Sequence, residues 1–439
     1  MQLELLRDAG AAPDAVPVYF KTDGGAFAPT DPPQSLKSLC ALNNFNGDAG
    51  AVLAGSDGVV LGVGDGSDAF VSAAACEKLP EGDFRLAAEL APREATLAAL
   101  GWLLGAYQFG RYKSRSPRRA RLSAPANADV VSAKRAASAI GLVRDLVNTP
   151  ADDMTPANIE NAARTIAERH GVETKAIVGD ALLEENFPII HAVGRAAKAA
   201  PRLIDFVWGD ENAPKVTLVG KGVAFDSGGL NIKGAGGMSL MKKDMGGAAH
   251  VLGLAQMIMD AALPLRLRVL IPAVENAISG DAFRPGDILR SRKGLTVEIG
   301  NTDAEGRLIL SDALALAAEE SPDLLISMAT LTGAARVAVG PEIAPFYTDN
   351  DDLAAAISRF GTDEADPVWR MPLWKNYQSM LSSTTADMNN ISSTSFAGSI
   401  TAALFLKRFA PPSDQWAHFD IYAWRPAAAP GRPVGGEAQ

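Results

Sequence analysis

The stretch VTLVGKGVAFDSGGLNIKG, residues 216–234, joins a short apolar run to a glycine-rich loop. The apolar residues 216–219 predict a buried strand, and the glycines allow the backbone of the loop to approach a ligand closely. From about residue 200 the same order of strand, glycine-rich loop and helix recurs. It predicts strands at residues 203–208, 216–219, 267–271, 295–299, 324–328 and 418–422, and helices at 246–262 and 308–319.

This alternation predicts an α/β fold. We expect a large C-terminal domain with a central mixed, mostly parallel sheet flanked by helices, whose active site lies at the carboxyl ends of the strands. The first part of the chain reads as a smaller N-terminal α/β domain, with strands at 16–21 and 59–63 and a helix at 93–110. Helices follow at 130–147 and from Pro156, where Thr155 is expected to cap the helix and Gly171 to end it. The predicted division is therefore 1–125 for the N-terminal domain, 126–170 for connecting helices and 171–439 for the catalytic domain.

Composition narrows the class of protein. The chain has 439 residues, and its 51 acidic against 41 basic residues give a formal net charge of −10, which argues against a dedicated nucleic-acid binder. Two cysteines and four histidines, no two of them closely spaced, exclude a cysteine-based zinc site and an H-E-x-x-H helix. Any metal ion would therefore need carboxylate ligands. We see no signal-peptide pattern and no apolar run long enough to cross a bilayer, so a soluble cytoplasmic protein without membrane contact is expected.

A basic run interrupts this acidic chain. Residues 111–121 carry six lysines and arginines and no acid. Such a run suits a nucleic-acid or anion patch, and it suits equally a solvated helix end and linker. A DNA-binding regulator built on the same scaffold is therefore kept as a second hypothesis.

Three segments carry the acidic residues that matter for chemistry. They are residues 219–234, MKKDMGGAA at 241–249 and NTDAEGRL at 301–308. They supply Asp226, Asp244, Asp303 and Glu305, and if these carboxylates converge they repel one another unless cations compensate them. Two divalent cations balance four carboxylates, which is the arrangement of a two-metal hydrolytic site. In an extended loop, Asp303, Glu305 and Arg307 would point the same way.

Bland alternatives exist for each segment. Any of the three alone also fits a plain turn. Residues 301–312 loosely match an EF-hand loop, but the preceding segment reads as a strand rather than a helix, which excludes that motif in this context. From the ligands alone, a two-metal hydrolase acting on phosphoesters also remains open.

The segments resemble a known family. NTDAEGRL resembles the signature octapeptide of the leucyl aminopeptidase family, the cytosolic dinuclear-metal exopeptidases, and VGKGVAFDSGG and MKKDMGGAA resemble its other two metal-binding segments in the same order. The resemblance extends over about residues 140–425. It implies release of N-terminal amino acids from peptides by a water activated between two metal ions, and it implies a homohexamer.

The resemblance also implies the roles of individual residues. Two divalent metal ions per chain, Mn or Zn, would be bound by Lys221, Asp226, Asp244, Asp303 and Glu305. Lys221 would have to bind as the neutral amine, because an ammonium has no lone pair.

Two further cations complete the implied catalytic set. Lys233 would remain protonated and stabilise the developing oxyanion. Arg307 would hold a small anion, (bi)carbonate in the family, with help from the backbone amides near Gly306 and Leu331.

The resemblance places the pocket for the first substrate side chain at Met241 and Thr330. Near the C-terminus the family reads HLDIAG where this chain has HFDIYAW at 418–424, so Tyr422 stands where a small pocket residue is usual. Tyr422 and Trp424 either reshape the pocket or merely pack its wall, and the preferred side chain is left open.

Overall fold

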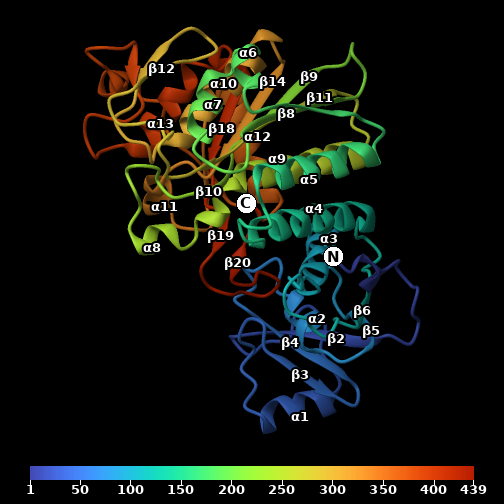
Figure 1. Cartoon of the computed structure of the whole chain (residues 1–439). Helices are drawn as coiled ribbons and strands as arrows, with labels where there is room; N and C mark the ends of the chain where they lie inside the picture. The colour runs from blue at the N-terminus through green and yellow to red at the C-terminus, as the bar shows by residue number, and fades with distance from the viewer. The chain divides into compact units, whose positions relative to one another are not determined.

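The computed structural model describes residues 1–439, except for the side chain of Ser413. The chain forms two compact units (Figure 1). The first contains Met1–Leu142, Asp363–Ala365 and Arg425–Val434, and the second contains Val143–Thr362, Asp366–Trp424 and Gly435–Gln439. None of the described helices has the length and apolar character needed to cross a membrane.

The first unit is built on a six-stranded sheet with the order β1-β6-β5-β2-β4-β3, in which only the β3–β4 pair is antiparallel. Trp102 lies fully buried against this sheet, and its Nε1 donates to the carbonyl of Ala120 at 3.0 Å. The elements are β1 Leu6–Arg7, β2 Val16–Thr22, α1 Gln34–Leu42, β3 Val52–Gly55, β4 Gly58–Gly64, α2 Ala73–Lys78, β5 Gly82–Leu86, α3 Pro92–Gly105, β6 Ala120–Ser123 and the start of α4 Val130–Asn148.

The second unit holds the nine-stranded sheet, with the order β16-β15-β18-β14-β9-β11-β8-β7 and β10 beside β11. Its elements before residue 290 are α5 Pro156–Arg169, β7 Thr174–Val178, α6 Ala181–Glu184, α7 Pro188–Gly194, β8 Arg202–Trp208, β9 Lys215–Gly220, β10 Gly222–Asp226, α8 Ala235–Met238, η2 Met241–Met245, α9 Gly246–Asp260, β11 Arg266–Asn276 and β12 Ile288–Arg290. Those that follow are β13 Thr296–Glu298, α10 Glu305–Glu319, β14 Leu324–Ala329, α11 Gly333–Val339, β15 Ala344–Tyr347, α12 Asp351–Asp363, β16 Val368–Arg370, η3 Lys375–Leu381, β17 Met388–Asn389, α13 Gly398–Lys407, β18 Trp416–Asp420, β19 Trp424–Arg425 and β20 Gly435–Gly436.

The centre of this sheet is parallel. Strands β18, β14, β9 and β11 are parallel neighbours, β10 runs parallel beside β11, and the antiparallel pairs β15–β18, β11–β8 and β8–β7 lie outside this block. The predicted mixed, mostly parallel sheet is therefore confirmed.

Helices cover both faces of the sheet (Figure 1). Val219 belongs to the buried core formed with α7, α10 and α13, whereas the next residue, Gly220, lies against Val251 of α9. Because successive strand residues point to opposite faces, α9 covers one face and α10 the other.

Several predicted elements need correction. The strand predicted at 295–299 is the shorter β13, Thr296–Glu298, which pairs with β12 and β17 in a separate three-stranded sheet and not in the central sheet. The helix predicted at 93–110 ends at Gly105, which packs so closely on the carbonyl of Ala73 that a Cβ would lie 2.4 Å from its oxygen. The strand β10 was not predicted.

The helix α5 begins at Pro156 as predicted, but its cap differs. The Thr155 hydroxyl donates to Oδ1 of Asn158 at 2.6 Å instead of accepting a helix amide, and the same oxygen accepts the Thr155 amide at 3.3 Å. Gly171 follows the helix with φ +70°, as expected for a residue that ends it.

Asp312 in α10 anchors the core. Its buried carboxylate accepts the amides of Ile189 at 2.9 Å and Ile190 at 3.3 Å, at the start of α7, and the amide of Arg292 at 2.8 Å. Burial raises its pKa to about 7 although these hydrogen bonds favour the charged form. One side chain therefore joins α10 to α7 and to the segment after β12.

We expect Asp312→Ala to lower the free energy of unfolding by about 3 kcal/mol, because three backbone amides lose their acceptor. Urea unfolding followed by circular dichroism measures this difference. Asp14→Ala, which removes an exposed carboxylate, serves as the control and should change the value by less than about 0.5 kcal/mol. Equal stabilities of the two variants would show that Asp312 is not an anchor.

Candidate metal centre

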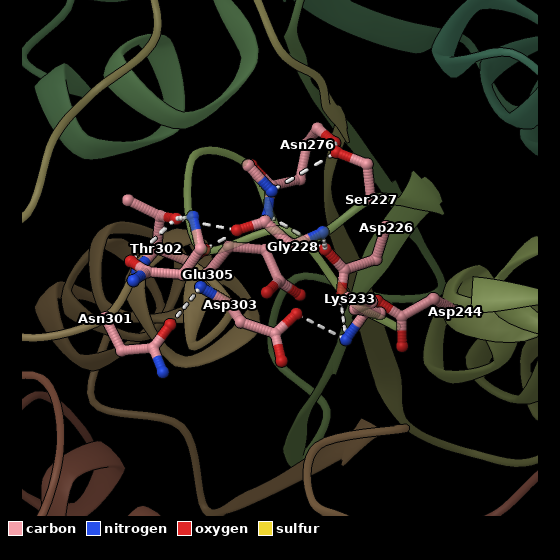
Figure 2. A network of polar contacts seen from close by, with 12 residues as sticks. Asp226, Ser227, Gly228, Lys233, Asp244, Asn276, Asn301, Thr302, Asp303 and Glu305 are labelled. Atoms are coloured by element: carbon pink, nitrogen blue, oxygen red, sulfur yellow. Dashed lines mark hydrogen bonds and ion pairs between the residues drawn. The ribbon is translucent and has the colours of Figure 1, made fainter. Parts of the chain in front are cut away.

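The three predicted segments meet at the carboxyl ends of the parallel strands (Figure 2). Lys221 directly follows β9, and Asp226 is the last residue of β10. Asp244 lies in η2 before α9, and Glu305 is the first residue of α10. The sheet topology therefore brings together residues that are up to 84 positions apart in the chain.

Two glycines make this convergence possible. A Cβ on Gly247 would lie 2.2 Å from the carbonyl oxygen of Met328, so only glycine lets α9 begin against the end of β14. A Cβ on Gly306 would lie 2.7 Å from Nζ of Lys221, so the lysine reaches Glu305 across the bare backbone of α10.

Lys221 is the centre of the first charged group. Its Nζ lies 2.7 Å from Oδ2 of Asp244 and 2.9 Å from Oε1 of Glu305, and it donates to the carbonyl of Thr330 at 3.0 Å. All four residues are buried. The ammonium thus compensates two carboxylates that have little access to water.

Lys233 is the centre of the second group. Its Nζ lies 2.7 Å from Oδ2 of Asp226 and 2.5 Å from Oδ1 of Asp303 (Figure 2). The four predicted acidic residues are therefore divided between two lysines.

The charges shift one another's pKa values. Burial and the neighbouring Asp226 charge raise the pKa of Glu305 well above its usual range, and the same causes raise the pKa of Asp303. Burial alone lowers the pKa of Lys221 and of Lys233, but the surrounding carboxylates outweigh it, so both pKa values are raised. The site consequently favours added positive charge.

The side chains fit a divalent metal ion. Asp226, Asp244 and Glu305 each offer a buried oxygen, and these oxygens all lie within 4.8 Å of one another. Oε2 of Glu305 has no hydrogen-bond partner among the described residues. Oxygen-rich donor sets of this kind suit hard or borderline dications. Ligation by Lys221 would require loss of the proton that its raised pKa retains.

The expected extended alternation of Asp303, Glu305 and Arg307 is wrong. Asp303 lies in a turn, whereas α10 begins at Glu305 and includes Arg307. Residues two apart on a helix do not face each other. Accordingly, Asp303 reaches Lys233 and Glu305 reaches Lys221.

A polar frame that the sequence reasoning missed holds these loops together (Figure 2). Nδ2 of Asn276 donates to Oδ1 of Asp226 at 2.8 Å and to the carbonyl of Thr302 at 3.0 Å. The Thr302 hydroxyl donates to the carbonyl of Gly228 at 2.6 Å and accepts the amide of Asn231 at 2.9 Å. The signal was present, since Thr302 lies inside NTDAEGRL and Asn276 at the end of an apolar run.

Asn390 was also missed, and it holds the turn before α10. Its fully buried side chain accepts the amide of Gly300 at 2.8 Å and donates to the carbonyl of Asn301 at 2.8 Å, and its own carbonyl accepts from Arg307 at 2.8 Å. The Nε of Arg307 has no hydrogen-bond partner among the described residues. Burial lowers the pKa of Arg307 to about 10, which leaves it charged at neutral pH.

The two backbone amides predicted to bind an anion, those of Gly306 and Leu331, differ from each other in their surroundings. Gly306 lies in the first turn of α10, where amides lack partners within the helix. The Leu331 amide donates to Oδ1 of Asp420 at 3.1 Å, so it already has an acceptor.

The predicted pocket residues lie around η2 and the ends of β14 and β18. The Thr330 hydroxyl donates to Oδ1 of Asp244 at 2.8 Å, and Met241 begins η2, half-buried. Tyr422 is half-buried two residues after β18, and the ammonium of Lys243 lies 4.9 Å from its ring centroid. Burial lowers the pKa of Lys243 to about 8.

The basic run of residues 111–121 is partly neutralised within the first unit. Arg119 pairs with Glu81 at 3.0 Å and Arg121 with Asp83 at 2.8 Å. Arg118 donates to a backbone carbonyl, that of Glu77. These contacts favour a structural role over a free nucleic-acid patch.

Two family models match the chain. Residues 141–436 match the cytosol aminopeptidase family, catalytic domain, and residues 38–125 match the M17 aminopeptidase, N-terminal domain. The chain therefore belongs to the cytosol aminopeptidase family, and the predicted resemblance is confirmed.

Curated relatives agree. The chain is 43% identical over 306 residues to a probable cytosol aminopeptidase of Stenotrophomonas maltophilia, a match that covers 68% of this chain but only 62% of the relative. It is 40% identical over 360 residues to a probable cytosol aminopeptidase of a Geobacter species, covering 78% of this chain and 73% of the relative.

Solved structures extend the likeness to nearly the whole chain. The cytosol aminopeptidase of Coxiella burnetii superposes with a TM-score of 0.91 at 44% identity, covering 99% of this chain and 96% of that one. The bottromycin maturation enzyme BotP in complex with Mn gives a TM-score of 0.85 at 32% identity, with 97% and 96% covered. None of the relatives named here has a name that points to DNA binding.

We expect Asn390→Ala to lower turnover by about 10- to 100-fold, the usual effect of removing a partner that orients site residues. Asn390→Asp keeps the acceptor for Gly300 but loses the donor to Asn301, so its rate should fall between those of Asn390→Ala and the wild type. Peptidase assays measure the rates, and thermal unfolding shows whether each variant is folded. Asn376→Ala, at an exposed position in η3, is the control. A folded Asn390→Ala with wild-type turnover would contradict the positioning role.

Proposed function

We propose that this chain is a metal-dependent aminopeptidase that releases the N-terminal residue of peptides. The observation that carries the proposal is the meeting of Asp226, Asp244 and Glu305 at one buried point, in a chain that belongs to the cytosol aminopeptidase family. The alternative of a DNA-binding regulator has no comparable support, because three arginines of the basic run make hydrogen bonds or ion pairs within the chain itself.

We propose two divalent metal ions per chain, Mn or Zn, held by Asp226, Asp244, Asp303 and Glu305 with the neutral amine of Lys221. The Mn complex of BotP, a relative with the same fold, favours Mn as the first ion to test. When bound, such ions bind the substrate amine, polarise the scissile carbonyl and acidify water.

The chain's own cations supply the remaining chemistry. The raised pKa of Lys233 keeps its ammonium charged at neutral pH, so it is suited to stabilise the oxyanion that forms on the scissile carbonyl. Arg307 is suited to hold a small anion such as (bi)carbonate, since its buried Nε has no partner among the described residues. Arg307 and the Gly306 amide would hold such an anion, which would supply proton-transfer chemistry in a site where no histidine is among the predicted residues.

The wider assignments are proposals too. Met241, Thr330 and Tyr422 would line the pocket for the N-terminal side chain. We also propose a cytoplasmic homohexamer, as the family resemblance implies, and a division into residues 1–125, 126–170 and 171–439.

We expect the Mn- or Zn-loaded protein to hydrolyse leucine p-nitroanilide and not its N-acetyl derivative, because binding requires a free α-amino group. Release of nitroaniline is followed by absorbance with both substrates at equal concentration. The proposal fails if folded, metal-loaded protein cleaves no amino-acid p-nitroanilide, or cleaves the N-acetyl derivative as well as the free amine.

We expect Glu305→Gln to bind fewer metal ions per chain and to lose nearly all turnover, because the neutral amide is a much poorer ligand for a dication. Elemental analysis after gel filtration gives the metal content. Glu319→Gln is a matched control at the other end of α10, where Glu319 pairs with Arg292. Undiminished metal content in Glu305→Gln would remove Glu305 from the ligand set.

A further inference from the structure

Two cations lie close to the ring of Tyr422. The Nζ of Lys243 is 4.9 Å from its ring centroid, and the guanidinium carbon of Arg336 is 4.7 Å from the same centroid. An aromatic face attracts a cation, and the ring can therefore hold two like charges near each other.

Neither cation is in direct contact with an acid, although Arg336 is exposed to solvent whereas Lys243 is buried. The side chains of Lys243 and Arg336 have no hydrogen bond or ion pair among the described residues. Lys221 and Lys233, by contrast, each contact two carboxylates. Since Lys243 is only 6% exposed, leaving its ammonium without an anion is costly unless a ligand supplies one.

The nearby acids are already engaged. Asp244 and Asp420 act on Lys243 through their charge. However, Asp244 is held by Lys221 and the Thr330 hydroxyl, and Asp420 by the Thr332 and Ser399 side chains. Neither acid contacts Lys243 or Arg336 directly, so both cations remain without a direct anionic partner among the described residues.

The neighbouring Lys242 also lies near an aromatic ring, but its ammonium has a hydrogen-bond acceptor. Its Nζ lies 5.7 Å from the ring centroid of Trp424 and also donates to the carbonyl of Asn148 at 2.7 Å. Lys242 therefore has an acceptor for its ammonium, whereas the adjacent Lys243 has none among the described residues.

The pair lies beside the candidate metal centre. Lys243 directly precedes Asp244, and Arg336 is on α11, which begins three residues after Thr330. A Cβ on Gly246 would lie 2.5 Å from Cβ of Ala423 and 2.8 Å from Cγ2 of Thr330. Gly246 therefore packs closely against both the residue after Tyr422 and the pocket residue Thr330.

We propose that Lys243 and Arg336, which both lie close to the ring of Tyr422, make the pocket selective for peptides whose N-terminal residue carries a carboxylate side chain. The proposal rests on the proposed aminopeptidase function. Lys243 and Arg336 are specificity-determining residues in it: the carboxylate of an N-terminal glutamate or aspartate supplies the missing anion, whereas an N-terminal lysine or arginine is repelled.

Anilides of single amino acids test this directly, because they have no C-terminal carboxylate that would mask the effect. Glutamate and glutamine p-nitroanilides have nearly the same shape and differ in charge. For the Mn-loaded full chain we expect kcat/KM for the glutamate substrate to exceed that for glutamine by about tenfold, as a charge-assisted pair would give, and lysine to be the poorest substrate. The ratio should fall in 1 M NaCl.

Variants identify the residues responsible. Arg336→Gln and Lys243→Met should each bring the glutamate-to-glutamine ratio toward one, and Arg336→Glu should invert the preference toward lysine. Because the glutamate-to-glutamine ratio is measured separately for each variant, a general loss of activity does not change it. Arg359→Gln is the matched control, because the exposed Arg359 also lies 4.7 Å from a ring centroid, that of Phe360 on α12, and its loss should leave the ratio unchanged.

The outcomes separate the two proposals. If leucine p-nitroanilide is cleaved but the wild-type ratio is one or less, the selectivity is wrong and the aminopeptidase function stands. A ratio above one that survives both Arg336→Gln and Lys243→Met also overturns the assignment to these residues. If the folded, metal-loaded protein cleaves none of the anilides, leucine included, both proposals fail.

Discussion

Four carboxylates that only two lysines compensate, at the end of a parallel sheet, are the constraint around which the second unit is organised. The four acids lie at the end of β10, in η2, in the turn before α10 and at the start of α10, and at least two of them have raised pKa values because burial and mutual repulsion oppose ionisation. Lys221 and Lys233 divide the four between them. The same need for positive charge makes the cluster suited to divalent ions, so the interaction that organises the loops also defines their chemistry.

Backbone geometry and uncharged polar groups keep the charges in place. Gly247 and Gly306 permit approaches that a Cβ would block. Asn276, Thr302 and Asn390 bind the backbone of the loops, and Asn276 also orients Asp226 directly. In contrast to this hydrogen-bonded network, the two cations near Tyr422 have no direct anionic partner among the described residues. On one side of the site, lysines and carboxylates are paired. On the other side, Lys243 and Arg336 have no direct anionic partner, and this positive charge is what a substrate side chain would meet.

Much of this was predictable from the sequence, since strand–glycine–helix alternation gave the parallel sheet and the segments around Asp226, Asp244 and Asp303 gave the candidate ligands. The failures have physical causes. The strand β13 looks like a central strand in isolation, and only its partners β12 and β17 reveal a separate sheet. Asn390 is 89 positions from Asn301 and lies in no periodic pattern, so only the folded chain brings it to the turn. The meeting of Lys243 and Arg336 at Tyr422 likewise depends on three segments, η2, α11 and the loop after β18.

The helix α10 has two roles: it presents site residues, and it anchors neighbouring segments of the core. Its first turn presents Glu305 and Arg307, and two turns later Asp312 ties it to the start of α7. A lesion in the anchor is therefore also a lesion in the site, since a helix cannot shift at one end only. Selection for turnover therefore also acts on the residues that stabilise α10. It restricts substitutions at positions that do not contact the substrate.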